Sequence, residues 1–225
     1  MKPSRRLQIW VVVPARNEAK YLFRVLQKIR RYTSRIIVVD DGSTDNTARV
    51  ARKCTPHVLV HRVNLGKGAA LKTGCEYAFH HLGAGAVVFI DADDQHDPAE
   101  LPLFFSAIQA ENPVVLGART FGRAMPWLKQ GGNKVASWVV WLLFGAYIPD
   151  IPCGYKALTR ASYQQLKWNA MGYEVELELA CRIARRKLPY KTICVSTIYR
   201  DMNKGMTVLD VLKIVQLVVV WRVQL

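Results

Sequence analysis

The sequence has few cysteines, and they lack the spacing of a metal site or a disulfide framework. The five cysteines are scattered, odd in number and without a C-x-x-C pair. This usage argues against a disulfide-stapled secreted fold and is typical of free thiols in a reducing compartment. We expect each cysteine to be a small buried hydrophobic residue.

Linkers, internal repeats and low-complexity stretches are also absent from the 225 residues. An unbroken chain of this length is expected to form one domain with a sizeable core, here over residues 1–206. The basic start, Met1 to Arg6, leads only into a short apolar run that Pro14 ends. That run is expected to be a strand and not the core of a signal peptide.

Acidic residues are scarce: 17 Asp and Glu stand against 32 Lys and Arg, which leaves a formal net charge of +15. Such an excess attracts polyanions, namely nucleic acid, an anionic membrane surface or phosphorylated small molecules. Nucleic acid is disfavoured, because the aromatic-basic strand motif of RNA-binding domains is missing and the acids cluster at predicted strand ends, where they would repel phosphates.

The common glycine-rich nucleotide motifs are missing as well. Neither G-x-x-x-x-G-K-[ST] nor G-x-G-x-x-G occurs, which argues against a kinase-type NTPase and a nicotinamide enzyme. The stretch from Asn64 to Ala70 instead places two glycines around Lys67 at a predicted helix start. Free backbone N–H groups at such a start favour anions.

Short β-branched runs alternate with longer helical patterns, which predicts an α/β fold built on a mainly parallel sheet. Ligands bind at the carboxyl ends of the strands in such sheets. Three polar motifs lie at those ends, at residues 14–18, 40–45 and 91–97. The expected strands are 9–13, 36–39, 58–61, 86–90 and 114–116, and the expected helices are 19–31, 45–53, 68–81 and 98–111.

The motif after the fourth strand predicts a metal site. Asp91 and Asp93 project to the same side of an extended segment, and two close carboxylates repel unless a cation bridges them. With Gln95 they offer oxygen ligands, which favour Mg²⁺ or Mn²⁺ and leave positions for substrate phosphates. The alternative is an acidic turn that caps the next helix, with Asp97 as the N-cap. His96 fits a supporting role better than that of a ligand.

Asp40 and Asp41 follow the second strand and precede a glycine turn. A carboxylate there can accept hydrogen bonds from a base or a ribose. A plain turn with a helix cap explains the same pattern, so both interpretations stay open on these residues alone.

Four ordered motifs carry a family resemblance: Val13 to Glu18, Val39 to Ser43, Gly66 to Gly68, and Asp91-Ala92-Asp93-x-Gln95-His96. Together they resemble the inverting glycosyltransferases of family two, and most closely the dolichyl- and polyprenyl-phosphate mannose and glucose synthases. The likeness extends to Arg200 and covers roughly the first 205 residues. It implies a Rossmann-like GT-A catalytic domain, with a mainly parallel sheet and helices on both faces.

The resemblance also implies roles for individual residues. The donor nucleotide sugar would be bound by Pro14, Arg16, Glu18, Val39, Asp41, Lys67, Asp91, Ala92, Asp93, Gln95 and Arg119. Asp91, Asp93 and Gln95 would hold Mg²⁺ or Mn²⁺, and the catalytic set would be Asp93, Arg119 and Arg200. Arg200 and Lys204 would bind the acceptor phosphate. Arg16 and Asp94 depart from the family pattern, because relatives commonly have an aromatic and an apolar residue at these two positions.

The implied reaction moves a hexose from a GDP-mannose or UDP-glucose type donor to a polyprenyl or dolichyl phosphate with inversion. A phosphate acceptor is largely a dianion at neutral pH and needs little help from a base. The alternative is a soluble family-two enzyme with a hydroxyl acceptor, which needs a carboxylate base. Glu174, Glu176 and Glu178 are the candidates for that base. A solvated helix face explains these acids equally well, and we favour that interpretation for Glu178.

Two apolar segments favour a membrane partner. Val135 to Ile148 suits a core or interfacial helix, and its Trp138 and Trp141 suit a headgroup boundary. Residues 207–225 are expected to form an amphipathic helix at the membrane interface or in a homodimer, with packing on the domain itself as the alternative. We therefore expect a cytoplasmic protein bound peripherally to the cytoplasmic face of a membrane.

Overall fold

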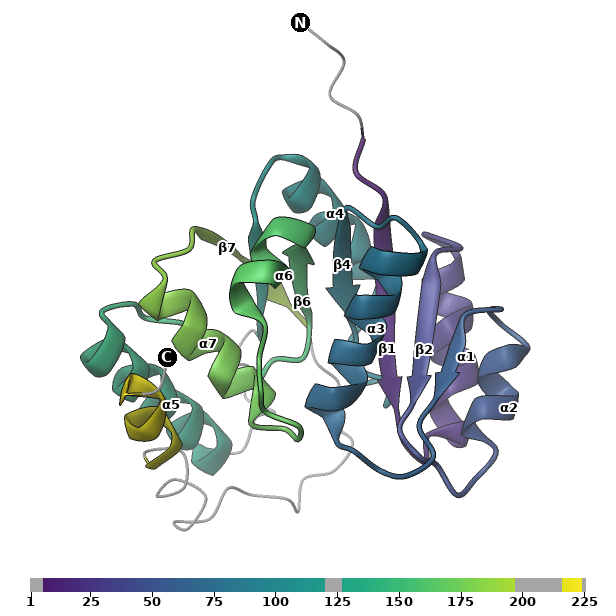
Figure 1. The fold of residues 1–225 in the computed structure, drawn as a ribbon, viewed down its shortest axis with the longest axis horizontal. Helices are drawn as coiled ribbons and strands as arrows, with labels where there is room; N and C mark the ends of the chain where they lie inside the picture. The colour runs from purple at the N-terminus through teal and green to yellow at the C-terminus, as the bar shows by residue number, and fades with distance from the viewer. Residues whose placement is uncertain (1–5, 120–126, 197–215, 224–225) are drawn as a thin grey trace, which may run out of the picture.

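The computed structural model describes residues 6–119, 127–196 and 216–223. They form a seven-stranded sheet in the order β3-β2-β1-β4-β6-β5-β7, with helices on both faces (Figure 1). The expected α/β fold is confirmed, since among the described strands every pairing is parallel except those of β6. The strands are β1 (Ile9–Ala15), β2 (Ile36–Asp40), β3 (Val58–Val60), β4 (Ala86–Phe89), β5 (Val114–Arg119), β6 (Lys156–Thr159) and β7 (Tyr190–Val195).

Alternate residues of the central strand β1 serve the two faces of the sheet. Trp10 and Val12 join the core that lies under α3 (Lys67–His81), α5 (Trp127–Phe144), α6 (Arg160–Leu166) and α7 (Val175–Arg185). Val11 and Val13 join the core under α1 (Ala19–Arg30), α2 (Thr47–Arg52) and α4 (Leu101–Gln109). Because both faces are covered, the central strands are continuous apolar runs.

The strand β6 was not expected from the sequence. It lies antiparallel between β4 and β5, with Lys156 opposite both Phe89 and Leu116. Since β6 runs against its neighbours, its first residue lies at their carboxyl ends. The loop of residues 150–155 is therefore brought to the same edge of the sheet as the polar motifs.

Most expected elements are present with shifted ends. The expected helix 98–111 is a short 3₁₀ turn, η1 (Pro98–Glu100), followed by α4. Asp97 precedes this turn and accepts a hydrogen bond from the Ala99 N–H at 3.0 Å, which confirms it as an N-cap.

The cysteines are free, as expected, and three of them are buried: Cys75, Cys153 and Cys181. The expectation of burial is wrong for Cys54, which is half-buried, and for Cys194, which is exposed. Cys194 lies on β7, an edge strand on which residues alternate between the core and solvent.

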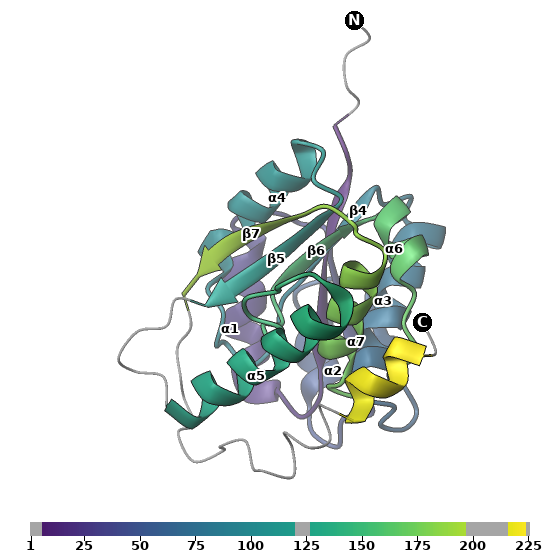
Figure 2. The same ribbon diagram turned by 90° about the vertical axis from the view of Figure 1, so that its left-hand side faces the viewer.

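Residues 216–223 are helical and lie beside α5 (Figure 2). Val218 is buried in the core, and the Arg222 guanidinium lies 5.8 Å from the centre of the Phe144 ring. Arg185 of α7 donates to the Arg222 carbonyl at 2.9 Å. One side of this helix therefore packs on the domain. No helix within the described parts of the chain is both long enough and apolar enough to cross a membrane.

Candidate active site

A pocket of about 310 Å³ opens at the carboxyl ends of β1 and β2 and beside the segment that follows β4. The three polar motifs of the sequence meet here, together with the start of α3 and the loop before α7. The lining residues are Pro14, Ala15, Arg16, Glu18, Asp41, Asn64, Gly66, Lys67, Ala70, Asp91, Ala92, Asp93, Gly172 and Tyr173.

The first two strand-end loops are joined by reciprocal hydrogen bonds. Asn17, which has a positive φ of 55°, donates its N–H to Ser43 Oγ at 2.9 Å, and its side-chain oxygen accepts from the Thr44 N–H at 2.8 Å. Asp45 accepts from the N–H groups of Ala19 and Thr47. Asp45 thus holds the turn and the start of the following helix. The hydrogen bonds between the two loops fix this wall of the pocket without a ligand.

Asp41 is buried, and the protein itself engages both of its carboxylate oxygens. Oδ1 accepts from the Leu65 N–H at 2.9 Å and lies 2.8 Å from His61 Nδ1, while Oδ2 accepts from the Gly66 N–H at 2.7 Å. With its amide oriented to satisfy both neighbours, Asn64 donates to Asp41 Oδ2 and accepts from Arg16 Nη1. Asp41 therefore shapes the loop that carries Asn64 and Gly66 into the pocket.

The start of α3 differs from the expected anion site. The Gly68 and Ala69 N–H groups donate to the carbonyls of Gly172 and Met171, at 3.2 and 3.0 Å, so they are not free for an anion. A Cβ on Gly68 would clash with the Ala170 carbonyl oxygen. The glycine therefore permits close packing of the 170–172 loop, and the positive charge at the start of this helix is that of the Lys67 side chain.

Lys67 links two acids across the pocket. Its Nζ lies 2.7 Å from Asp91 Oδ1 and 3.1 Å from Glu176 Oε1. Burial lowers the pKa of Lys67, but these two carboxylates outweigh it and raise the pKa well above its usual value. Burial likewise raises the pKa of Asp91, and the Lys67 ammonium reverses this and lowers it. Both groups are therefore charged at neutral pH.

Within the described residues, neither Asp93 nor Glu18 forms an ion pair, and each lies near other acidic side chains. Burial and the neighbouring Asp91 raise the pKa of Asp93. Burial, and then Asp93, Asp45 and Asp91, raise the pKa of Glu18 to about 6. Gln95 donates its N–H and its side-chain amide to Asp93, at 3.0 and 2.8 Å. It orients this carboxylate and does not line the pocket.

These residues fit a divalent cation that shares its ligands with a substrate. Within the described residues, no three His, Cys, Asp or Glu side chains group closely enough to hold a metal ion. Asp91 and Asp93 would supply two carboxylates, and substrate phosphates and water would supply the rest, as Mg²⁺ sites often do. Of these two aspartates, Lys67 pairs with Asp91 alone, and the mutual repulsion of the two neighbouring carboxylates is the physical reason for such a site.

Asp94 ties the acidic loop to α1. Its backbone has a positive φ of 59°, and its side chain is buried. Oδ2 lies 2.7 Å from Arg24 Nη2, and Oδ1 accepts from Lys28 Nζ at 2.9 Å. These two contacts fix the loop that carries Asp91 and Asp93 to α1.

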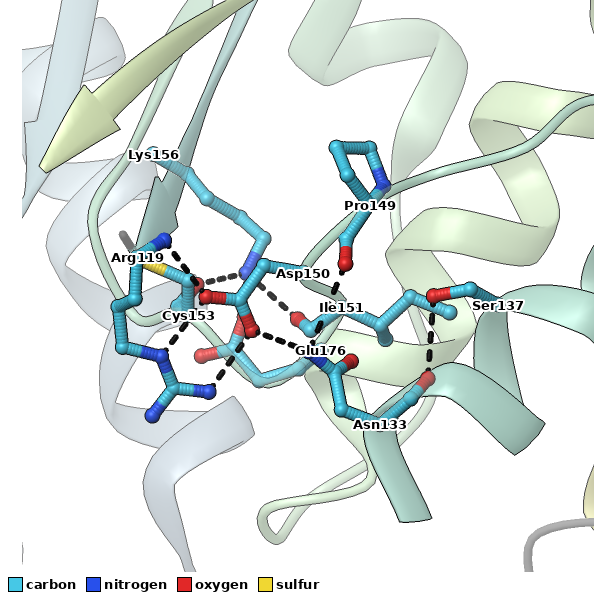
Figure 3. A network of polar contacts seen from close by, with 9 residues as sticks. All are labelled: Arg119, Asn133, Ser137, Pro149, Asp150, Ile151, Cys153, Lys156 and Glu176. Carbon is cyan, nitrogen blue, oxygen red and sulfur yellow. Dashed lines mark hydrogen bonds and ion pairs between the residues drawn. The ribbon is translucent and has the colours of Figure 1, made fainter. Parts of the chain in front are cut away.

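Arg119 lies outside the pocket lining, although we expected it to face the donor diphosphate. Its backbone N–H, Nε and Nη2 all donate to the buried Asp150 carboxylate, at 2.7 to 2.8 Å. Asn133 of α5 donates to Asp150 Oδ1 at 2.9 Å, the oxygen that also accepts from Arg119 Nη2 (Figure 3). A bidentate, partly buried pair of this kind fixes the end of β5.

Lys156 is a buried cation close to this network. It is linked to Lys67 of the pocket through Glu176, which pairs with both lysines. Lys156 Nζ donates to Glu176 and to the carbonyls of Ile151 and Cys153 (Figure 3). The charges Asp91, Lys67, Glu176 and Lys156 therefore alternate along one chain of contacts. Each ion in this chain is paired, as buried charges must be.

The solvated-face interpretation of the α7 acids is wrong for Glu176 and Glu178. Both are buried. Glu178 accepts from the Asn169 and Ala170 N–H groups and from Arg182 Nε, at 2.7 to 3.1 Å. It therefore holds the loop that packs on α3, and Glu174 accepts from the Gly172 N–H in the same loop.

Of the expected donor-site residues, eight line the pocket: Pro14, Arg16, Glu18, Asp41, Lys67, Asp91, Ala92 and Asp93. Val39 is fully buried in the core. Arg200 and Lys204 lie outside the described residues. His96 is buried against Tyr155, and burial lowers its pKa, which suits a supporting role.

Sequence reasoning missed two lining residues of the loop before α7, Gly172 and Tyr173. The Tyr173 side chain is 81% exposed at the pocket, with Lys67 Nζ 5.9 Å from its ring centre. The only local signal was a glycine before a predicted helix, which does not show what the loop faces.

Comparisons with known proteins give the family of the chain. Residues 10–167 match the family model described as glycosyl transferase family 2. The chain is 29% identical to the UDP-N-acetylglucosamine–dolichyl-phosphate N-acetylglucosaminyltransferase of Methanococcus voltae, over 92% of each protein. It is 28% identical to the polyprenol monophosphomannose synthase of Mycolicibacterium smegmatis, over 81% of this chain and 73% of that protein.

A solved structure supports the fold. Glucosyl-3-phosphoglycerate synthase from Mycobacterium tuberculosis, in complex with Mn²⁺, UDP and glucosyl-3-phosphoglycerate, superposes with a TM-score of 0.74 at 21% identity. The match covers 97% of this chain and 81% of that one. At 21% identity this likeness is evidence for the fold only, and it confirms the expected GT-A architecture. The family match and the acidic pocket at the strand ends together identify the chain as a member of glycosyl transferase family 2 and thus as a glycosyltransferase.

Proposed function

We propose that this enzyme moves a hexose from a nucleoside-diphosphate sugar to a polyprenyl phosphate, with inversion and with Mg²⁺ or Mn²⁺. The observation that carries the donor part is the convergence of Asp91, Asp93 and Lys67 on one pocket. Two carboxylates suit a cation and an ammonium suits a phosphate, so the set matches a metal-bound diphosphate. The metal, when bound, would offset charge on the departing nucleoside diphosphate.

A phosphate acceptor is supported by the contacts of Glu176 and Glu178, two of the candidate bases for a hydroxyl acceptor. Glu176 is paired with Lys67 and Lys156, and Glu178 is held by Arg182 and by backbone N–H groups. Both carboxylates are thus already engaged by partners within the protein. A hydroxyl acceptor would need a free carboxylate to take its proton, whereas a phosphate dianion would not. The names of the relatives from Methanococcus voltae and Mycolicibacterium smegmatis also specify lipid acceptors.

The other residues of the proposed site position and screen the substrates. Asp41 and Asn64 hold the loop beside the nucleoside end, and Asp150 fixes Arg119 near the edge of the sheet. Arg200 and Lys204, which follow β7, would bind the acceptor phosphate through charge-assisted hydrogen bonds. A lipid acceptor would place the enzyme peripherally at the cytoplasmic face of a membrane.

The deciding experiment is a transfer assay with radiolabelled GDP-mannose, UDP-glucose and UDP-N-acetylglucosamine, each with Mn²⁺, Mg²⁺ or chelator. Polyprenyl phosphate is compared with the free polyprenol and with 3-phosphoglycerate, a soluble hydroxyl acceptor. We expect metal-dependent label in the lipid phosphate fraction alone, with an inverted anomer by NMR. Transfer to 3-phosphoglycerate but not to the lipid would establish the hydroxyl-acceptor alternative.

Variants of Arg200 test the acceptor role separately. Arg200→Ala should raise KM for polyprenyl phosphate and lower turnover while leaving the Kd of the nucleotide sugar nearly unchanged. Lys at this position should rescue only partly, because it lacks the planar fork. Loss of donor affinity with an unchanged acceptor KM would instead assign Arg200 to the donor site.

A further inference from the structure

The carboxylate of Asp41, at the nucleoside side of the pocket, is occupied by the protein itself. A carboxylate offers about four lone-pair positions to hydrogen-bond donors. Around Asp41 these are taken by the N–H groups of Leu65 and Gly66, by His61 Nδ1 and by the Asn64 amide. The Asp41 side chain is also buried. A base in the pocket would therefore have to displace one of these contacts to reach the carboxylate.

Arg16 presents hydrogen-bond donors at the same side of the pocket. It follows β1, which lies beside β2 and ends at the same edge of the sheet (Figure 1). Its side chain is exposed and lines the pocket, and Nη1 donates to the Asn64 side-chain oxygen at 3.1 Å. A guanidinium has five N–H donors and no acceptor. The contact with Asn64 uses one of them, so Arg16 can offer a pair of donors to a ligand.

The bases differ in how they meet such a pair of donors. Guanine has two adjacent acceptors, N7 and O6, and an arginine donates to both at once. Adenine carries an amine in place of O6, and this amine is itself a donor. Uracil has its N3–H between two carbonyl oxygens, so a guanidinium that approaches this edge brings one N–H against another. Uracil would need an acceptor for N3–H, and the nearby Asp41 carboxylate is already engaged.

Asn64 holds the Arg16 guanidinium in place. Its amide donates to Asp41 Oδ2 at 2.7 Å, while its oxygen accepts from Arg16. A side chain that is positioned before the ligand arrives loses less conformational entropy on binding than a free one. An unrestrained arginine can stack on the flat face of any base, which is not selective. The contacts from Asp41 through Asn64 to Arg16 favour hydrogen bonds at the edge of the base instead.

We propose that Arg16 selects a guanine nucleotide sugar as the donor by donating to N7 and O6 of the base, and that Asn64 and Asp41 position Arg16. The inference rests on the proposed function, because it assigns the base of the same donor. Binding of nucleoside diphosphates without sugar or acceptor tests the base separately from the transfer reaction.

Isothermal titration calorimetry with Mn²⁺ compares GDP, UDP, ADP and two analogues of GDP. 7-Deaza-GDP lacks the N7 acceptor, whereas inosine diphosphate lacks only the N2 amine and keeps N7 and O6. We expect GDP and inosine diphosphate to bind alike, and UDP and ADP to bind about tenfold or more weakly. 7-Deaza-GDP should bind about three- to tenfold more weakly than GDP, because one of two hydrogen bonds is lost.

Variants of Arg16 identify the residue that reads the base. Arg16→Met should bring the Kd values of GDP, 7-deaza-GDP and UDP within about twofold of one another. Arg16→Lys should restore only part of the preference, because an ammonium lacks the planar fork. Arg62→Met is the matched control, since Arg62 is exposed two residues before Asn64 and is not among the lining residues. It removes the same charge and should keep the preference for GDP. Thermal unfolding shows that each variant is folded.

The results that would overturn the proposal differ from those that would overturn the proposed function. Equal or tighter binding of UDP by the wild type would exclude guanine selection and leave the transfer reaction standing. A loss with inosine diphosphate but not with 7-deaza-GDP would place the reading group at the opposite edge of guanine and exclude Arg16. Equal weakening of all nucleotides by Arg16→Met would show stacking or charge alone. If the wild type binds none of the nucleotides with Mn²⁺, the proposed function fails together with this inference.

Discussion

The Lys67 ammonium lies 2.7 Å from Asp91 Oδ1, so an internal cation neutralises a carboxylate that the proposed metal also needs. Lys67→Met removes this internal competitor. We expect Mn²⁺ alone to raise the Tm more in the variant than in the wild type, while the affinity for the nucleotide sugar falls about tenfold. Without metal, the free energy of unfolding should fall by about 3 kcal/mol, because a largely buried pair is broken.

Lys72→Met is the control for Lys67, since Lys72 lies on the same helix but outside the pocket, with Nζ 3.4 Å from the Trp168 carbonyl oxygen. Differential scanning fluorimetry and calorimetric titration measure the two quantities. An identical Mn²⁺ response in the Lys67 variant and the wild type would contradict competition for Asp91.

Substitutions of Asp93 and Asp150 are expected to have different effects, the first on turnover and the second on the free energy of unfolding. Asp93 lines the pocket and accepts hydrogen bonds from Gln95, whereas Asp150 is buried and accepts four hydrogen bonds from Arg119 and Asn133. Asp93→Asn should lower turnover by about a hundredfold or more and leave the urea midpoint nearly unchanged. Asp150→Asn should lower the free energy of unfolding by about 3 kcal/mol. Equal destabilisation by both substitutions would contradict this division.

Glu18 predicts a pH dependence of stability. Its pKa is about 6 in the folded protein against an ordinary value of 4.5, so the unfolded state loses this proton first. The contribution of Glu18 to stability is therefore present below pH 4.5 and is lost as the pH rises through about 6. Glu18→Gln should match the wild type below this window and exceed its Tm by about 2 to 4 °C above it, a modest gain because the side chain is partly exposed.

Added Mn²⁺ should close the gap between Glu18→Gln and the wild type, because a cation near Glu18 favours its charged form. Glu111→Gln, at an exposed position after α4, is the control. A difference in Tm that is the same at both ends of the pH range would show an effect unrelated to ionisation.

The ion pairs of Asp94 with Arg24 and Lys28 predict an effect on the Mn²⁺ concentration that the enzyme needs. Asp94→Asn keeps a side chain that tolerates the positive φ but removes both ion pairs. We expect the Mn²⁺ concentration for half-maximal activity to rise about three- to tenfold, with turnover retained at saturating Mn²⁺. The R24M/K28M double variant should reproduce this shift, and Asp94→Asn should add nothing in that background. Additive shifts would show that Asp94 acts by another route.

Much of the fold follows from local patterns. β1, β2 and β4 are largely apolar runs with polar motifs at or just after their carboxyl ends, and both features can be seen without coordinates. β6 could not be found in this way. It is four residues long, begins with a lysine and depends on β4 and β5, of which β4 lies about 70 residues earlier in the chain.

In the candidate site, too, the residues in local motifs could be predicted, whereas contacts between distant segments could not. Asp91, Asp93 and Glu18 were found because each lies in a motif at a strand end. The partner of Lys67 on α7 and the carbonyls that occupy the start of α3 come from residues 171–176, about a hundred positions away in sequence. Such pairings depend on tertiary packing, which helical spacing and helix-start signals do not encode. For the same reason Glu178 was mistaken for a solvated residue.

The antiparallel strand β6 also has a consequence for how the chain acquires its structure. Until residues 156–159 have been synthesised, β4 and β5 have no strand to join them, and each keeps an open hydrogen-bonding edge. Open, apolar edges pair with other chains, and contacts between distant segments form slowly. We expect fragments that end before residue 156 to aggregate, whereas the insertion of β6 unites the two halves of the sheet into one cooperative unit.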